Sequence, residues 1–331
     1  QTPNPPFIYA TEEVQFTNHD DAAVLAGTLT HPLTFSFKKD EKVPVVVMVT
    51  GSGLQNRDEE IVGHKPFAVL AHHLALKGIA SLRYDDRGFG KSTGDVENAT
   101  TKTFASDALA AINMLRKNDK FCSVGILGHS EGGTIAMMIA ADGKADFAVS
   151  LAGTMLPGDS VLIDQNVRIL KASGLDDATS TEYGIALGRL FDFMKKNPGA
   201  KQWNGLENAI ADQTRLSPAM KANLPEILKQ RNNWMDYFLA YNPAAAIKKC
   251  KVPVMAINGE LDCQVNCSAN LNAISRNLPN NAKSVTKSYP GLNHLFQHAQ
   301  TGLTNEYGTI EETISPEVIT DIINWILANY K

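Results

Sequence analysis

The sequence predicts an α/β fold, in which a mostly parallel sheet carries helices on both faces and is interrupted by a helical insertion. Strand and helix patterns alternate from Val45 to Leu151. Residues 155–241 then show helical patterns alone, and the alternation resumes at Val252. One sheet domain that contains an insertion explains this order better than two consecutive domains do.

The first part of the sheet domain begins with two short strand patterns, at 14–17 and 24–30. The turn-forming residues at 19–21 between them predict a hairpin. The β-branched run at 45–49 is typical of a strand that is buried on both faces. The segments that follow are a helix at 66–77, a strand at 79–84, a helix at 103–117, a strand at 123–127, a helix at 132–141 and a strand at 147–151.

The insertion contains two clear helical stretches, at 180–196 and 225–239. The sheet domain is then completed by strands at 252–258 and 284–289 and by a helix at 316–330. We therefore place the sheet domain at 7–154 and 242–331 and the helical insertion at 155–241.

The composition excludes several classes of protein. The chain has 331 residues, of which 44% are hydrophobic and 20% are charged, as in globular proteins with a large core. The 31 basic and 35 acidic residues give a net charge of −4, and no basic cluster marks a face for nucleic acid. The longest apolar run, Val43–Val49, is far shorter than the roughly 18 residues that a membrane helix needs. We therefore expect neither a nucleic-acid partner nor a membrane span.

The cysteines and the first residue bear on the compartment of the protein. Four cysteines are too few for a disulfide scaffold in a chain of this length. Cys263 and Cys267 lack the two-residue spacing of a zinc or redox motif, so we expect free, packed thiols. The chain begins with Gln1 rather than Met, which agrees with removal of a secretory signal. We expect export to the periplasm or the cell exterior, with a cytoplasmic location as the alternative.

The pentapeptide Gly128-His129-Ser130-Glu131-Gly132 carries the strongest functional signal. A G-x-S-x-G pattern between a strand and a helix is typical of a nucleophile elbow, a turn so sharp that glycines must flank the serine. The pattern alone is weak, but here an apolar strand precedes it and an apolar helix follows. We expect Ser130 to be a nucleophile and His129 to point into the fold and pack there.

A serine nucleophile needs a histidine base and a carboxylate that orients the base, in the chain order Ser, acid, His. Asp262 follows one predicted strand and His294 follows the next, so both lie where the loops of a parallel sheet gather active sites. Glu260 competes with Asp262 for the role of the acid, and His298 competes with His294 for that of the base. We prefer Asp262 and His294 because of their positions after the strands.

These motifs make the sequence resemble an α/β-hydrolase, and most of all the bacterial carboxylesterases of the serine-aminopeptidase-like branch, which carry a helical cap. Further motifs of the resemblance are residues 51–58, 86–92, 259–262 and 291–294. Relatives often have histidine where this chain has Thr50, which leaves the support of the following loop open. The resemblance implies that the insertion at 155–241 is a cap over the site.

Acyl transfer also requires two backbone N–H groups that hold the oxyanion, each worth about 3 kcal/mol of barrier. One is expected from Glu131, the residue after the nucleophile. The family pattern places the second at Ser52, and Leu54 is the alternative if the loop folds differently. Only backbone atoms take part, so the side chains at these positions are weakly constrained.

Three other features are expected to be structural. The segment Gly90–Ser92 ends like a phosphate-binding loop but lacks the required earlier glycine. Asp85 and Asp86 beside Arg87 suggest an ion-paired turn that supports neighbouring loops rather than a metal site. Aromatic residues of the insertion at helical spacing fit packing better than a substrate pocket: Phe191, Phe193, Trp203, Trp234, Tyr237 and Phe238.

The sequence thus predicts a serine hydrolase that cleaves carboxylic esters of small molecules through an acyl-enzyme, with Ser130, His294 and Asp262 as the triad. The chemistry needs no metal and no organic cofactor. An exopeptidase or other amidase, or a thioesterase, on the same scaffold is the alternative within enzymes. A binding protein that kept the fold without activity is the alternative outside them. The sequence leaves the acyl and alcohol specificity and the oligomeric state open.

Overall fold

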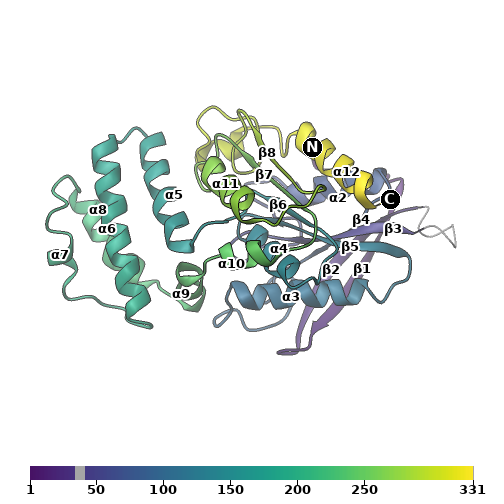
Figure 1. The fold of residues 1–331 in the computed structure, drawn as a ribbon, viewed down its shortest axis with the longest axis horizontal. Coiled ribbons are helices and arrows are strands. Elements are labelled where there is room, and N and C mark those ends of the chain that lie inside the picture. The colour runs from purple at the N-terminus through teal and green to yellow at the C-terminus, as the bar shows by residue number, and fades with distance from the viewer. Residues whose placement is uncertain (34–41, 331) are drawn as a thin grey trace.

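The structure, a computed structural model, describes residues 1–33 and 42–330. Its centre is an eight-stranded sheet with the order β1-β2-β4-β3-β5-β6-β7-β8 (Figure 1). The strands are β1 (Tyr9–Asn18), β2 (Ala23–Pro32), β3 (Val43–Val49), β4 (Ala80–Tyr84), β5 (Phe121–His129), β6 (Ala148–Leu151), β7 (Val254–Gly259) and β8 (Val285–Tyr289).

The sheet is parallel from β4 to β8, and β1 and β2 form the antiparallel part. The predicted hairpin is confirmed, although both of its strands are longer than the sequence pattern suggested. All seven residues of β3 are buried, as the β-branched run predicted. Because β3 to β8 run in the same direction, the loops after them meet at one edge of the sheet.

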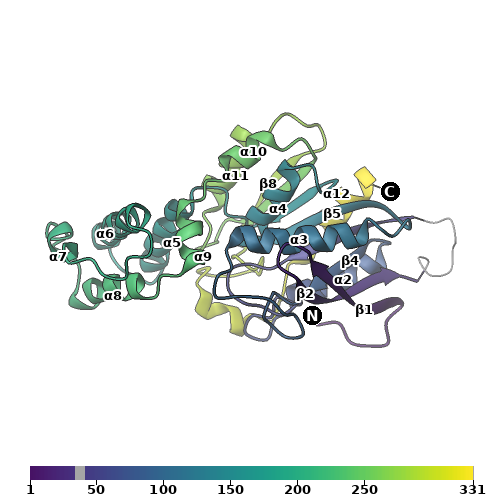
Figure 2. The same ribbon diagram turned by 90° about the horizontal axis from the view of Figure 1, so that it is seen from below.

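Helices cover both faces of the sheet, as predicted (Figure 2). One face packs against α3 (Thr101–Leu115), α4 (Glu131–Ala141), α10 (Ala244–Lys249) and α11 (Cys267–Asn277). The other face packs against α2 (Pro66–Leu76) and α12 (Pro316–Tyr330). A short 3-10 helix, η1 (Thr304–Thr309), lies in the loop before α12. The helix at 267–277 was not predicted.

The helical insertion lies between β6 and β7 and projects from one end of the sheet domain (Figure 1). Its helices are α5 (Gly158–Ala172), α6 (Asp177–Lys196), α7 (Leu206–Ala209), α8 (Pro218–Lys229) and α9 (Asn233–Ala240). Residues of α6 to α9 form a hydrophobic cluster of their own, centred on Leu187, Leu190 and Leu224. The prediction of a single helix at 225–239 is wrong. The helix α8 ends at Lys229, and α9 begins at Asn233, where the side chain of Asn232 caps its first turn.

The cysteines match the prediction of free thiols, and three of the four are buried. Within the part of the chain that the structure describes, no helix combines the length and the apolar character that crossing a bilayer requires.

Candidate active site

Ser130 stands at the sharp turn between β5 and α4, which we call the serine turn (residues 128–132). Its φ angle is +55°, an uncommon value for a residue with a side chain. Such strain persists only where the surrounding structure holds it, and it concentrates at functional sites. The turn also leaves the first N–H groups of α4 without partners inside the helix. The N–H of Glu131 is among them, and it directly follows Ser130.

The glycines of the serine turn are required by close contacts with the backbone. A Cβ on Gly128 would lie 1.9 Å from the carbonyl oxygen of Gly132. A Cβ on Gly132 would lie 2.2 Å from the carbonyl oxygen of Val49, at the end of β3. The turn is therefore pressed against the loop that follows β3.

Asp262 and His294, from the loops after β7 and β8, form a buried pair. The Nδ1 atom of His294 lies 2.7 Å from Oδ2 of Asp262. The other carboxylate oxygen, Oδ1, accepts hydrogen bonds of 2.8 Å from the backbone N–H groups of Gln264 and Val265. Both oxygens are thus engaged, and the carboxylate is fixed toward the imidazole.

The two competing residues have other partners. Glu260 accepts a hydrogen bond of 2.7 Å from the hydroxyl of Ser288. The ring of His298 is exposed and contacts Glu312 at 2.8 Å. The structure therefore brings Asp262 together with His294, the pair that the sequence favoured.

His129 is buried in the fold, as predicted, and both of its ring nitrogens make polar contacts there. Its Nδ1 atom lies 2.9 Å from Oε1 of Glu59, and its Nε2 atom lies 2.9 Å from the carbonyl oxygen of His294. The His129 and His294 rings are tilted, with centroids 4.6 Å apart. The contact of Nε2 with the His294 carbonyl joins the serine turn to the backbone of residues 290–298, which we call the His294 loop.

The loop after β3, residues 50–59, is held by several acidic residues, among them Asp86 and Glu59; we call it the Thr50 loop. The Thr50 hydroxyl donates a hydrogen bond of 2.8 Å to Asp86, whose other oxygen accepts one of 2.8 Å from the Gln55 N–H. The N–H of Gly51 donates to Oε1 of Glu59 at 2.9 Å. Thr50 and Asp86 thus support this loop in a chain that has threonine where relatives often have histidine.

Burial and the nearby charge of Glu59 raise the pKa of Asp86 to about 7. The hydrogen bonds from Thr50 and Gln55 act in the opposite direction on this pKa. No sequence motif indicated a role for Glu59. Its only signal was its place directly after the motif at 51–58. Because Glu59 is eight residues from Gly51, only the folding of the loop brings them into contact.

The predicted ion-paired turn exists, but its partners are not neighbours in the sequence. Asp85 pairs with Arg57 of the Thr50 loop at 2.8 Å. Arg87 pairs with the buried Asp107 of α3 at 2.6 Å and also with Asp21. These ion pairs attach the turn to the Thr50 loop, to α3 and to the β1–β2 hairpin. Within the described residues, no group of three or more His, Cys, Asp or Glu side chains is arranged to hold a metal ion.

The side chain of Glu131 connects the serine turn to the helical insertion. Its buried carboxylate accepts a hydrogen bond of 2.6 Å from the Thr101 hydroxyl. The indole N–H of Trp234, in α9, donates to both carboxylate oxygens, at 2.8 and 3.0 Å. Burial raises the pKa of Glu131, while these hydrogen bonds oppose the shift.

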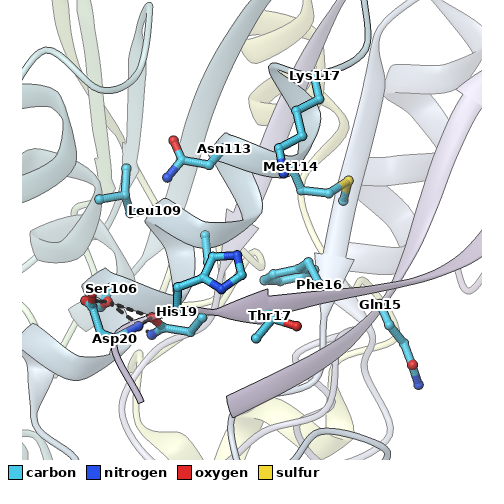
Figure 3. Close-up of a pocket in the computed structure, with 12 residues that line it drawn as sticks. Gln15, Phe16, Thr17, His19, Asp20, Ser106, Leu109, Asn113, Met114 and Lys117 are labelled. Atoms are coloured by element: carbon cyan, nitrogen blue, oxygen red, sulfur yellow. Dashed lines mark hydrogen bonds between the residues drawn. The ribbon is translucent and has the colours of Figure 1, made fainter. Parts of the chain in front are cut away.

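A groove elsewhere in the molecule does not contain these residues. It lies between β1 and α3 and has a volume of about 350 Å³. In Figure 3, Asp20 and Ser106 are joined by a hydrogen bond on its wall, and His19, Asn113 and Lys117 also line it. The Asp262–His294 pair and Ser130 lie outside this groove.

The strand order and the strained turn after β5 define the molecule as an α/β-hydrolase by fold. The ferulic-acid-bound structure of Est1E from Butyrivibrio proteoclasticus has a TM-score of 0.56 at 18% identity, covering 96% of this chain and 98% of that one. The α/β-hydrolase GrgF from Penicillium sp. sh18 has a TM-score of 0.57 at 17% identity, covering 97% and 99%. Proline iminopeptidase from Mycobacterium smegmatis has a TM-score of 0.56 at 13% identity, covering 96% and 98%.

The particular family is that of the X-Pro dipeptidyl-peptidases (S15 family), to which this chain belongs: the family matches residues 21–288. A curated relative is Esterase EstD from Thermotoga maritima, which is 35% identical over 151 residues. This match covers 46% of the present chain and only 35% of the length of EstD.

Proposed function

We propose that the protein is a serine esterase, in which Ser130, His294 and Asp262 form the catalytic triad. The observation that carries this proposal is the buried pair of Asp262 and His294. The backbone carbonyl of His294 is also hydrogen-bonded to the side chain of His129, the residue next to Ser130. The 35% identity to EstD supports ester hydrolysis as the reaction. The strained φ angle of Ser130 is the conformation expected of a nucleophile at such a turn.

In the proposed acylation step, the Ser130 hydroxyl attacks the ester carbonyl carbon, and Nε2 of His294 takes the hydroxyl proton. Asp262 fixes the Nδ1–H tautomer of His294 and stabilises the imidazolium. The backbone N–H groups of Glu131 and Ser52 hold the negative oxygen of the tetrahedral intermediate. The intermediate collapses with cleavage of the ester C–O bond, and the leaving alcohol takes the proton from His294.

Deacylation repeats these steps with water. His294 removes a proton from a water molecule, which attacks the acyl carbon of the acyl-enzyme. When the second tetrahedral intermediate collapses, the bond to Ser130 breaks and its oxygen recovers a proton from His294. The acid product leaves, and the residues return to their starting protonation states.

We propose that the insertion at 155–241 acts as a cap on the core formed by 7–154 and 242–331 and limits which esters enter. The contact between Trp234 and Glu131 supports this arrangement, because it places α9 next to the residue that follows Ser130. Three of the six aromatic residues singled out in the sequence pack in the hydrophobic cluster of the insertion. Phe193 stacks on Trp203 with centroids 4.4 Å apart, and Phe191 is buried in the same cluster.

The second candidate function is a peptidase that cleaves after an X-Pro dipeptide, which membership of the S15 family favours. Two substrate series distinguish the candidates: p-nitrophenyl esters of increasing acyl length, and X-Pro p-nitroanilides. The esterase proposal expects the higher kcat/KM for an ester. A kcat/KM for the X-Pro anilide equal to that for the best ester would favour the peptidase instead. An acyl thioester in the same panel tests the thioesterase alternative.

The triad itself is tested with a fluorophosphonate probe, which reacts with activated serines. We expect the unmodified protein to be labelled and Ser130→Ala to remain unlabelled. Ser173→Ala, which changes an exposed serine after α5, is the matched control and should be labelled like the unmodified chain. Absence of labelling in the folded, unmodified protein would favour a binding protein without activity.

A further inference from the structure

The contacts of His129 place a constraint on its protons. Both ring nitrogens face oxygen atoms at 2.9 Å, the Glu59 carboxylate on one side and the His294 carbonyl on the other. A neutral imidazole can donate from one nitrogen only, whereas an imidazolium donates from both. The Glu59 oxygen that faces His129 also accepts the N–H of Gly51.

Burial makes this pair electrostatically important. The side chains of His129 and Glu59 are 6% and 1% exposed. Charges so far from water interact strongly, and an unpaired one would be costly. Burial acts to lower the pKa of His129, but the Glu59 charge and the hydrogen bonds to Glu59 and the His294 carbonyl outweigh it and raise that pKa above its ordinary value.

We propose that Glu59 holds His129 as a buried imidazolium, and that this imidazolium is a positioning residue that fixes the His294 backbone. The proposal rests on the proposed role of His294 as the catalytic base. It assigns a positive charge to His129, the second residue of the serine turn. In the mechanism above, the side chain of His129 does not touch the substrate. It also makes Glu59 the common anchor of the Thr50 loop and the His294 loop.

The expected effect follows from the position of the His129 ring between Glu59 and His294. The His129 ring is next to the His294 ring, and Glu59 contacts the nitrogen of His129 that faces away from the His294 carbonyl. The His129 ring therefore joins the Glu59 carboxylate on one side to the His294 backbone on the other. The other ionisable groups that face this cluster are Asp262, which pairs with His294, and Asp86, which lies close enough to Glu59 to interact with its charge.

Glu59→Gln tests the charge with little change in shape. The amide oxygen can still accept the N–H of Gly51, but the charge that holds the imidazolium is gone. We expect kcat to fall by about tenfold while KM stays nearly unchanged, because a neutral His129 donates from one nitrogen only and holds the His294 backbone less firmly. The matched control is Glu60→Gln, whose exposed side chain contacts Asn56, and its kcat and KM should not change. A Glu59→Gln variant that folds and keeps the kcat of the unmodified chain would overturn the proposed positioning of the His294 backbone.

A second measurement does not depend on activity. In ¹⁵N-histidine-labelled Ser130→Ala, NMR shows directly which ring nitrogens of the eight histidines carry protons. We expect the His129 ring to carry protons on both nitrogens at pH 7, with its signals assigned by their loss in His129→Asn or by contacts with the His294 ring. A neutral His129 at pH 7 would overturn the proposal even if the esterase proposal held. If His129 is doubly protonated but the unmodified protein hydrolyses none of the substrates, the proposal of a buried imidazolium stands and the proposed catalytic triad is refuted.

Discussion

The indole N–H of Trp234 donates a hydrogen bond to the buried carboxylate of Glu131, with a distance of 2.8 Å to Oε1. This contact links two parts of the chain that are 103 residues apart, the helical insertion and the residue that follows Ser130. The backbone N–H of the same Glu131 is the proposed oxyanion donor. The position of α9 and the geometry at Ser130 are therefore coupled through one side chain.

Trp234→Phe should weaken this coupling. The substitution keeps an aromatic ring that can stack on Phe238 but removes the N–H donor, which leaves the Glu131 carboxylate with Thr101 as its remaining side-chain partner. We expect the free energy of unfolding to fall by about 1–3 kcal/mol, measured by urea denaturation at neutral pH. In the control Trp325→Phe, the lost bond goes to the carbonyl of Lys283 at the surface, where water can replace it, so the loss should be smaller. Equal losses in the two variants would contradict the importance of the buried contact.

Asp262→Asn tests the orientation of His294. The amide can keep an oxygen toward the N–H groups of Gln264 and Val265, which directs its NH₂ group at Nδ1 and favours the wrong tautomer of the ring. We expect kcat to fall by about 10⁴-fold while the fold is kept. Ester hydrolysis with purified protein measures this, with circular dichroism to check folding. Glu260→Gln is the matched control and should retain nearly full activity; a large loss there would shift the role of the acid to Glu260.

Gly132→Ala should disturb the contact between the serine turn and β3. The new methyl group would lie 2.2 Å from the Val49 carbonyl oxygen and 2.6 Å from that of Thr50, both backbone atoms that cannot rotate away. We expect a loss of roughly 3 kcal/mol in unfolding free energy and slower labelling of Ser130 by the fluorophosphonate probe. Gly143→Ala, at a φ of +64° with open space around it, should cost about 1 kcal/mol and leave labelling unchanged. Normal labelling of Gly132→Ala would show that the turn tolerates movement.

Much of the sheet domain could be predicted from the sequence because its elements have strong periodic patterns. The β-branched run of β3 and the alternation of strands with helices fix the fold class. The chain position of Asp262 and His294, each directly after a strand, then places them at one edge of the sheet. Local patterns therefore sufficed for the pair that the structure shows in contact.

The remaining features depend on contacts that no local pattern contains. In α11 the buried residues are Cys267, Asn270 and Ile274, so the helix presents no wide apolar stripe. The break between α8 and α9 is stabilised by Arg231, whose guanidinium donates to carbonyl groups at the end of α6, among them Met194. The roles of Glu59 and Trp234 likewise arise from partners that are distant in the sequence.

Asp86→Asn should change how stability depends on pH. The pKa of Asp86 is about 7 in the folded protein, against an ordinary value of 3.8. Between these values the folded state keeps a proton that the unfolded state has lost, so the contribution of Asp86 to stability falls as the pH rises and levels off above about pH 7. Asparagine cannot ionise, so the variant should gain stability relative to the unmodified chain from pH 4 to 7, by up to about 4 kcal/mol for a shift of this size.

Urea denaturation at intervals from pH 4 to 8 measures this difference. The amide introduced by Asp86→Asn can still accept the N–H of Gln55, and the Thr50 hydroxyl can rotate to accept from that amide, so the Thr50 loop should stay in place at every pH. Asp177→Asn, at an exposed position on α6, is the control for the loss of one surface charge and should not change the slope of stability against pH. If Asp86→Asn instead became less stable than the unmodified chain as the pH rose, the Asp86 carboxylate would be ionised and stabilising, and its pKa would lie below the ordinary value.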